Sequence, residues 1–307
     1  MSDLLRIATR KSKLALWQAE HVAEQLRRAH PDLRVELVPM TTQGDRIQDR
    51  SLAAIGGKGL FIKELEVAME ERRADIAVHS MKDVPADLPP GMALGAILPR
   101  ADTHDALISN HYAGVDSLPQ NARVGTSSLR RQAQLLARRG DLRIEALRGN
   151  VDTRLRRLDE GELHAIVLAC AGLIRLGRES RITERVAANI CLPAVGQGAI
   201  GIECRAGDES TLLRLRVMEH PDTRIALNAE RAFSQKLGGS CQSPIAALAQ
   251  IENGSLRLEG LVAEPDGSRI WRDSIQGAPA HAESLGATLA ERILNAGARA
   301  LLDRLSA

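Results

Sequence analysis

The residues with the clearest chemical potential are ten arginines within residues 123–157, a stretch that holds only three acidic residues. Several of them stand where predicted strands meet predicted helices: Thr126, Ser127, Ser128, Arg130 and Arg131 at one junction, and Arg148, Gly149 and Arg154 at the next. A helix N-terminus offers free N–H groups, and arginine pairs with carboxylate or phosphate through two parallel hydrogen bonds. The pattern favours an anion-binding site over its plain alternative, a solvated basic face.

A second candidate is the pair Lys82-Asp83, which follows the predicted strand 75–79. A carboxylate at the carboxyl end of a strand can move a proton or oppose a developing positive charge on a substrate. Its alternative is a structural acid that caps a helix or pairs with the lysine. His79, inside the apolar strand, is more typical of a core histidine with a satisfied hydrogen bond.

The four cysteines fall into two classes. Cys170, Cys191 and Cys204 lie in apolar runs and are predicted to be buried and inert. Cys241 lies in a loop rich in glycine, serine and proline after a predicted helix, so it is a candidate nucleophile or covalent attachment point. The alternative is an ordinary loop cysteine. No cysteine spacing suggests a metal site or a disulfide framework.

The elements that must position these residues follow a strand–helix alternation. The sequence predicts strands over 4–8, 35–40, 75–79, 106–109, 123–125, 143–147, 165–169 and 199–203, separated by helical patterns that include 14–29 (with Ser12 as its N-cap) and 60–72. This rhythm is typical of two α/β lobes with parallel sheets. From about residue 220 the pattern changes to a helix at 224–237, a hairpin at 256–275 and a long helical segment at 280–304, which together predict a small α+β domain.

Two further segments bear on a binding site. Arg10, Lys11 and Ser12 form a strand-to-helix junction in the first lobe, which resembles the junction at 126–131. One such junction per lobe predicts a polyanionic ligand between the lobes. Residues 42–59 are polar and glycine-rich, and a loop of this length in a compact domain is typical of a lid.

Composition excludes several classes of function. The 307 residues carry a net charge of +2, with 6 lysines, 35 arginines and five aromatic residues. A near-neutral chain with few aromatic rings argues against nucleic-acid binding, which depends on positive charge and base stacking. The N-terminus has no signal-peptide pattern and no apolar run could span a membrane, so we expect a cytoplasmic protein with no membrane partner.

Short strings along nearly the whole chain resemble the porphobilinogen deaminase (hydroxymethylbilane synthase) family. They are residues 7–10, 57–61, 79–85, 125–131, 147–150 and 193–198, together with the pattern around 230–246 that includes Gly239-Ser240-Cys241. Ser243 stands where this family usually has Val, Ile or Thr, and Lys13 replaces a common Pro. Neither departure removes a residue that carries chemistry.

The resemblance implies an enzyme that joins four porphobilinogen molecules head to tail, releases ammonia at each step and hydrolyses the product off as hydroxymethylbilane. It implies two doubly wound lobes like those of periplasmic binding proteins, plus a small α+β C-terminal domain. The domain boundaries it suggests are 1–99 with 199–217, then 100–198, then 218–307. It also implies a dipyrromethane cofactor, linked to Cys241 through a thioether, in a protein that we expect to be a monomer.

The same resemblance assigns roles to residues of this sequence. Asp83 would be catalytic: it would bind pyrrole N–H groups, assist ammonia loss and stabilise the cationic intermediate. Cofactor contacts would come from Ser80, Lys82, Thr126, Ser127, Ser128, Arg130, Arg131, Arg148, Gly149 and Arg154. Substrate contacts would come from Arg10, Ser12, Gln18, Lys58, Phe61, Arg175 and Gln197. No metal is implied.

Two rival functions remain open on the residues alone. A non-catalytic two-lobed protein that binds a polyanionic solute would need the same arginines. The expected cytoplasmic location and the Cys241 loop count against it. A nucleic-acid binder would use the arginines of 123–157, against which the charge balance and the shortage of aromatic residues count.

Overall fold

The computed structural model describes residues 4–46, 62–239 and 243–306. The predictions for Lys58, Phe61 and Cys241, and most of the predicted lid, lie outside these residues. Contacts divide the chain into two compact units, Met1–Ala101 with Ala199–Arg224, and Asp102–Gly198 with Ile225–Ala307. The three-domain division remains a prediction. Each unit is described below by itself.

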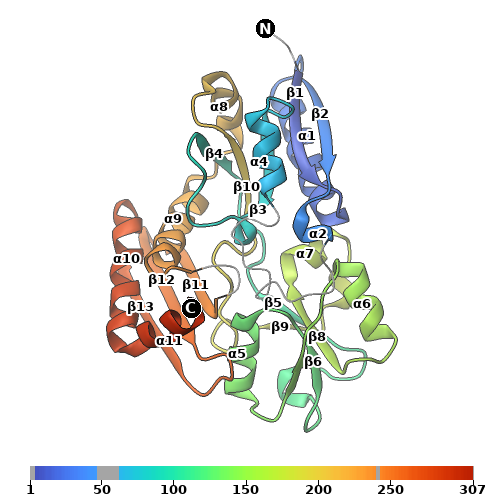
Figure 1. The fold of residues 1–307 in the computed structure, drawn as a ribbon, viewed down its shortest axis with the longest axis vertical. Helices are drawn as coiled ribbons and strands as arrows, with labels where there is room; N and C mark the ends of the chain where they lie inside the picture. The colour runs from blue at the N-terminus through green and yellow to red at the C-terminus, as the bar shows by residue number, and fades with distance from the viewer. Residues whose placement is uncertain (1–3, 47–61, 240–242, 307) are drawn as a thin grey trace. The chain divides into compact units, whose positions relative to one another are not determined.

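The first unit is built on a five-stranded sheet with the order β2-β1-β3-β10-β4 (Figure 1). Its strands are β1 (Leu4–Arg10), β2 (Arg34–Met40), β3 (Ile76–Ser80), β4 (Met92–Ile97) and β10 (Ile200–Arg205). β1 runs parallel to β2 and β3, whereas β10 runs antiparallel to β3 and β4. The sheet is therefore mixed, where the sequence pattern predicted a parallel one, because a returning antiparallel strand needs no crossover helix beside it.

Helices cover both faces of this sheet. α1 (Lys13–Ala29) buries Val22 and Leu26 against Ile76 and Val78. On the other face, α4 (Lys63–Glu70) buries Leu65 and Met69 against Ala77. Successive residues of β3 thus point to opposite layers, as the two-residue period of a strand requires. The unit also contains the short helices α2 (Gln43–Arg46) and α8 (Glu209–Leu215).

The second unit contains another mixed five-stranded sheet, with the order β7-β6-β8-β5-β9. Its strands are β5 (Asp105–Ile108), β6 (Arg123–Gly125), β7 (Arg143–Glu145), β8 (Ala165–Ala169) and β9 (Glu184–Val186). The helices α5 (Leu129–Arg138), α6 (Val151–Asp159) and α7 (Cys170–Arg175) begin four, six and one residues after the ends of β6, β7 and β8. Short strand-to-helix connections place the first helical turns at the carboxyl ends of β6, β7 and β8.

The same unit carries a three-stranded antiparallel sheet of β11 (Ile245–Glu252), β12 (Ser255–Ala263) and β13 (Ile270–Gly277). It packs with α9 (Pro221–Lys236), α10 (Ala282–Ile293) and α11 (Arg299–Ser306). Phe233 of α9 is fully buried over Gly260, where a Cβ atom would come within 2.5 Å of the ring. This close approach explains a glycine in the middle of a strand.

The predicted fold class is confirmed: two α/β sheets with helices on their faces, and a small α+β part at the C-terminal end. The predicted hairpin at 256–275 is β12 and β13. Ser12 does cap α1, because its Oγ accepts a hydrogen bond from the Ala15 N–H at 3.4 Å.

Candidate functional site

The predicted site residues of the first unit gather where β1 and β3 end. These strands are parallel neighbours, so their carboxyl ends lie at the same edge of the sheet. A small cavity of about 50 Å³ at this edge is lined by Arg10, Ser12, Gln18, Ser80 and Asp83, among others. Gln18 also donates a hydrogen bond from Nε2 to Ser80 Oγ at 2.8 Å. The structure therefore brings together five residues that the sequence placed up to 73 positions apart.

Asp83 closes a single 3-10 turn, Met81–Asp83, that follows β3 directly. Met81 anchors this turn, since its side chain is buried and its N–H donates to Ala199 O at 3.0 Å. The carboxylate of Asp83 is half-buried and makes no hydrogen bond or ion pair within the described part of the chain. The alternative of a capping or lysine-paired structural acid would require such a contact. Asp83 is thus placed as an acid available to a ligand.

Arg10 is already paired. Its guanidinium donates to the carboxylate of Asp45 through Nε at 3.2 Å and through Nη2. Burial alone would raise the pKa of Asp45, but hydrogen bonds from Arg10 and Thr42 outweigh it and lower that pKa. Asp45 therefore stays ionised, and a carboxylate of the chain occupies the position that a ligand carboxylate would take on Arg10.

The predicted anion-binding residues of the second unit include two that are almost fully buried. Arg130 and Arg131, in the first turn of α5, are 4% and 6% exposed. Arg130 Nη1 donates to Asp105 Oδ2 at 2.7 Å, and Arg131 donates to Asp105 Oδ1 through Nε at 3.0 Å and Nη2 at 2.7 Å. Their fork geometry, predicted to face an anion, is engaged by a carboxylate of the protein itself. Whether they also bind a cofactor stays a prediction.

Asp105 is the partner of Arg130 and Arg131 that the sequence patterns missed. It begins the apolar strand β5, is fully buried, and also accepts from Gln197 Nε2 at 3.0 Å and Cys191 Sγ at 3.3 Å. Burial would raise its pKa, but the charges of Arg130 and Arg131 lower that pKa far below the ordinary range. The only signal in the sequence is an acidic residue that opens an otherwise apolar strand.

This Asp105 cluster carries an excess of positive charge. Two guanidinium groups share one carboxylate, and the buried Arg130 Nε has no hydrogen-bond partner in the described residues. A buried donor without a partner has a considerable desolvation cost. An anionic group that reaches α5 would lower this cost, so the arrangement fits the predicted ligand chemistry. Cys191 stays neutral, since burial raises the pKa of its thiol to about 12.

The neighbouring junctions are shaped by local hydrogen bonds. Ser127 Oγ donates to Leu147 O at 3.0 Å, and Thr126 Oγ1 accepts from Ser128 N at 3.2 Å. The first bond connects the segments that follow β6 and β7, and the second lies within the loop between β6 and α5. Two of the three hydroxyls at this junction therefore stabilise the loop itself.

The turn that leads into α6 depends on Gly149. Its φ of +102° is one that other residues rarely adopt, and a Cβ there would lie 2.8 Å from Thr153. Arg154 Nε donates to Gly149 O at 2.8 Å, which fastens the turn to the helix. Arg148, just before this turn, is half-buried and has no ion-pair partner among the described residues. Arg148 is therefore a cation available to a ligand.

Two further predicted residues are held near the end of the 193–198 segment. Arg175 Nη2 donates to Gly198 O at 2.7 Å, and burial lowers the pKa of Arg175 to about 10, so it remains a cation at neutral pH. Gln197 is fully buried and donates to Thr103 O at 2.7 Å as well as to Asp105. Gln197 thus supports the Asp105 cluster directly.

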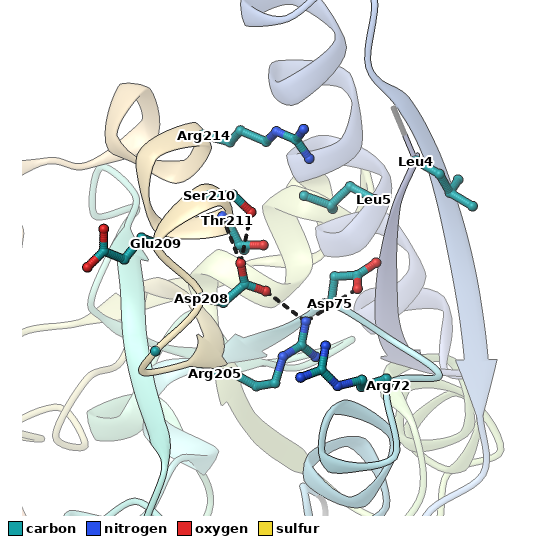
Figure 2. Close-up of a pocket in the computed structure, with 11 residues that line it drawn as sticks. Leu4, Leu5, Arg72, Asp75, Arg205, Asp208, Glu209, Ser210, Thr211 and Arg214 are labelled. Atoms are coloured by element: carbon teal, nitrogen blue, oxygen red, sulfur yellow. Dashed lines mark hydrogen bonds and ion pairs between the residues drawn. The ribbon is translucent and has the colours of Figure 1, made fainter. Parts of the chain in front are cut away.

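A larger cavity of about 660 Å³ in the first unit is a different kind of site (Figure 2). It lies at the opposite edge of the sheet, where β1 begins and β10 ends. Figure 2 shows Arg205 between Asp75 and Asp208, with Nη2 distances of 3.4 and 2.8 Å. None of the predicted site residues lines this cavity.

Family comparisons agree with the residue geometry. Residues 5–213 match the family model "Porphobilinogen deaminase, dipyromethane cofactor binding domain", and residues 225–295 match "Porphobilinogen deaminase, C-terminal domain". The chain belongs to the porphobilinogen deaminase family. Its function is therefore that of a hydroxymethylbilane synthase, a transferase of porphyrin biosynthesis, with a dipyrromethane cofactor.

Solved structures with distant similarity are binding proteins. They include the periplasmic VFT2 domain of BvgS from Bordetella pertussis (14% identity, 69% of this chain and 85% of that chain, TM-score 0.42). Others are the aliphatic sulphonate binding protein SsuA from Escherichia coli (12%, 76% and 70%, 0.42) and a nutrient binding protein from Burkholderia cenocepacia bound to methionine (14%, 69% and 90%, 0.43). At these scores the likeness carries no functional argument.

Two features are absent from the described residues. None of their helices is long and apolar enough to cross a membrane. Among these residues, no three His, Cys, Asp or Glu side chains are grouped so that they could hold a metal ion.

Proposed function

We propose that Asp83 is the catalytic acid of this porphobilinogen deaminase and that Cys241 carries the cofactor. The observation that supports the role of Asp83 most directly is its position: a half-buried carboxylate in a small cavity, on a turn anchored by Met81, with no partner in the described chain. A group held in place but left unpaired can bind pyrrole N–H groups and exchange protons with a substrate.

We propose separate roles for Asp83 and for the predicted substrate-binding residues. As ammonia leaves the substrate, positive charge develops on its methylene carbon, and the Asp83 carboxylate stabilises that charge at short range. Arg10 and Arg175 bind the acetate and propionate groups of the substrate, with Ser12, Gln18, Lys58, Phe61 and Gln197 completing the contacts. Arg10 exchanges the carboxylate of Asp45 for one of the substrate, so binding replaces one ion pair by another.

The donor set fits a dipyrromethane with its carboxylate side chains. The Asp105 cluster has one more cation than anion. Arg148 has no ion-pair partner among the described residues, and Arg154 lies in the first turn of α6. We propose that these cations and Ser80, Lys82, Thr126, Ser127, Ser128, Arg130, Arg131 and Gly149 bind the cofactor. When bound, the cofactor supplies the primer to which pyrrole units are added.

The first experiment is the intact mass of the purified chain beside a Cys241→Ser variant. We expect an added mass of two condensed pyrrole units that the variant lacks. A bare mass that porphobilinogen cannot increase would contradict the proposal and favour a non-catalytic binding protein. Cys204→Ser is the matched control, since Cys204 is buried and must leave the added mass unchanged.

The second experiment replaces Asp83 by Asn, which keeps the shape of the side chain and removes its charge. We expect loss of turnover by a factor of about 10² or more, because both proton transfer and charge stabilisation fail. Asp87→Asn is the control, an exposed acid four residues further on. Turnover by Asp83→Asn near the level of Asp87→Asn would disprove the assigned role.

We also propose that the chain acts as a cytoplasmic monomer with three domains bounded at 99, 198 and 217, and that it binds no nucleic acid. Three buried free thiols, Cys170, Cys191 and Cys204, suit a reducing compartment. Light scattering after gel filtration tests the monomer, and limited proteolysis tests the boundaries. A salt-titrated gel shift that detects a complex would contradict the last point.

A further inference from the structure

Three titratable side chains lie together beneath the Asp83 cavity, and the proposed function uses none of them. His79 belongs to β3, Glu203 to β10 and Glu66 to α4. Glu203 is paired in register with Ala77, two residues before His79, so both side chains point to the face of the sheet that α4 covers. We call these three residues the buried triad.

The buried triad is closed to solvent. The side chains of His79 and Glu203 are 3% and 0% exposed, and Glu66 is 8% exposed. His79 Nε2 lies 2.9 Å from Glu203 Oε2, a hydrogen-bond distance. Glu66 Oε1 and Glu203 Oε1 are buried and have no hydrogen-bond partner among the described residues.

Such a group cannot be fully ionised. Two carboxylates in a low-dielectric interior repel each other and lose their hydration, so the cluster must bind protons at neutral pH. The pKa of Glu66 is raised to about 7 by burial and, to a smaller extent, by the negative charges of Glu203 and Glu70. His79 and Lys63 have the opposite effect and lower this pKa, but they do not outweigh burial. The triad can therefore gain or lose a proton near neutral pH.

A histidine and a carboxylate that served only to stabilise the fold would not need a second carboxyl group beside them. A buried histidine is satisfied by one carboxylate, yet here a second carboxyl group is buried beside the pair at a considerable desolvation cost. His79 also lines the small cavity that Asp83 and Arg10 line. The triad thus connects a proton-binding interior to the cavity where the reaction needs protons.

We propose that His79, Glu203 and Glu66 are a proton store for Asp83, which takes up and returns one proton in each condensation step. This inference rests on the proposed catalytic role of Asp83. His79 is the member that exchanges protons with the cavity, and Glu203 and Glu66 act through it as positioning residues. Four successive condensations require Asp83 to return to the same protonation state after each step. A proton-binding group close to Asp83 shortens the path of that transfer.

The exchange is balanced in atoms and charge. In the first transfer the C–H bond of the pyrrole carbon breaks and an O–H bond forms on the Asp83 carboxylate. In the second transfer that O–H bond breaks and an N–H bond forms at His79 Nδ1, directly or through one water molecule. Asp83 becomes a carboxylate and His79 an imidazolium that Glu203 stabilises through Nε2–H. The reverse transfer supplies the proton that ammonia carries away, so no oxidant or reductant takes part.

The test compares His79→Gln, Glu66→Gln and Glu203→Gln in cofactor-loaded enzyme, with Glu70→Gln as the matched control. Glu70 lies one turn beyond Glu66 on α4 and is exposed. We expect His79→Gln to lower kcat by about 10²-fold with little change in KM. We expect Glu66→Gln to move the near-neutral limb of the pH–kcat profile by about one pH unit. Glu70→Gln should move it much less, because Glu70 has the smaller effect on the pKa of Glu66.

A second measurement does not depend on activity. NMR titration of the Glu66 side-chain carboxyl carbon in the cofactor-free chain should show a protonation step at about pH 7. Glu203→Gln should move this step to lower pH, because it removes a nearby negative charge that raises the pKa of Glu66. A Glu66 carboxyl group that does not titrate near neutral pH, or pH–kcat profiles that superimpose while stability falls, would overturn the proposal. Full turnover by Asp83→Asn would instead disprove the role of Asp83 and leave the titration result to stand on its own.

Discussion

Replacement of Asp105 by Asn tests whether one buried carboxylate maintains the second unit. Asn has nearly the same shape, so the change removes charge without creating a cavity. It leaves the buried Arg130 and Arg131 without a counter-ion, and the new amide N–H₂ faces guanidinium donors that lie 2.7 to 3.0 Å away. Breaking a buried ion pair in this way costs about 3–5 kcal/mol. Because one carboxylate serves two arginines, we expect the upper part of this range.

Urea unfolding followed by tryptophan fluorescence measures the effect. Trp271 is 8% exposed in β13 and reports on the second unit, while Trp17 belongs to α1 of the first unit. A Trp17→Phe background therefore isolates the relevant signal. The control is Asp116→Asn, which breaks a two-bond contact with Arg138 at the surface, where both side chains are more than half exposed. We expect that control to have little effect on the unfolding midpoint.

The dependence on pH gives an independent check. The pKa of Asp105 is lowered by folding, so its contribution to stability is complete above the ordinary pKa of about 3.9 and is lost as pH falls below it. The difference between wild type and Asp105→Asn should be constant from pH 5 to 8 and should shrink below pH 4. Equal midpoints for Asp105→Asn and Asp116→Asn at pH 7 would refute the reasoning.

Three further substitutions probe close packing and buried hydrogen bonds. Gly201→Ala places a Cβ against the sulfur of Met81, the residue that anchors the turn of Asp83. This substitution should lower kcat and destabilise the chain by about 1–3 kcal/mol. An unchanged kcat would contradict the role of Met81 as an anchor. Glu230→Gln removes one acceptor from a fully buried carboxylate that binds two backbone N–H groups at 2.7 and 2.8 Å, and should lower stability by about 1–3 kcal/mol in urea unfolding. Gly149→Ala should reduce cofactor loading, measured by intact mass, because the positive φ and the contact with α6 both oppose a side chain; full loading would show that the turn tolerates strain.

Much of the architecture was accessible from periodicity. The predicted strand 123–125 and the strands at 4–8, 35–40 and 165–169 lie within or coincide with β6, β1, β2 and β8. Strands with weak signals were not found: β4 contains Gly95, β9 has only three residues, and β11 is rich in alanine. β11 forms because it pairs along its whole length with β12, and such pairing partners are not visible in a local pattern.

The sequence predicted which residue types form the candidate site, but not which of these side chains pair with one another. Charge density and helix starts identified the arginines, since both are local properties. The partner of Arg130 and Arg131 is Asp105, which lies on a different strand 25 and 26 residues earlier in the chain. Likewise, His79 and Glu203 are 124 residues apart and meet only because β10 returns to pair with β3. Tertiary pairing decides which charged groups are engaged and which, like Arg148 and Asp83, remain available.

The returning strand β10 also determines when the first unit can fold during synthesis. β10 lies between β3 and β4, so the backbone edge of β3 stays unpaired until Ile200–Arg205 leaves the ribosome. At about 5–20 residues per second, the interval after Ser80 is on the order of 10 seconds. An open strand edge is a template for pairing with other chains. A ribosome that stalls within residues 100–198 therefore leaves a nascent chain with an exposed edge beside Asp83, whereas one that stalls only after Ile200–Arg205 has left the ribosome carries a first unit whose sheet can be complete.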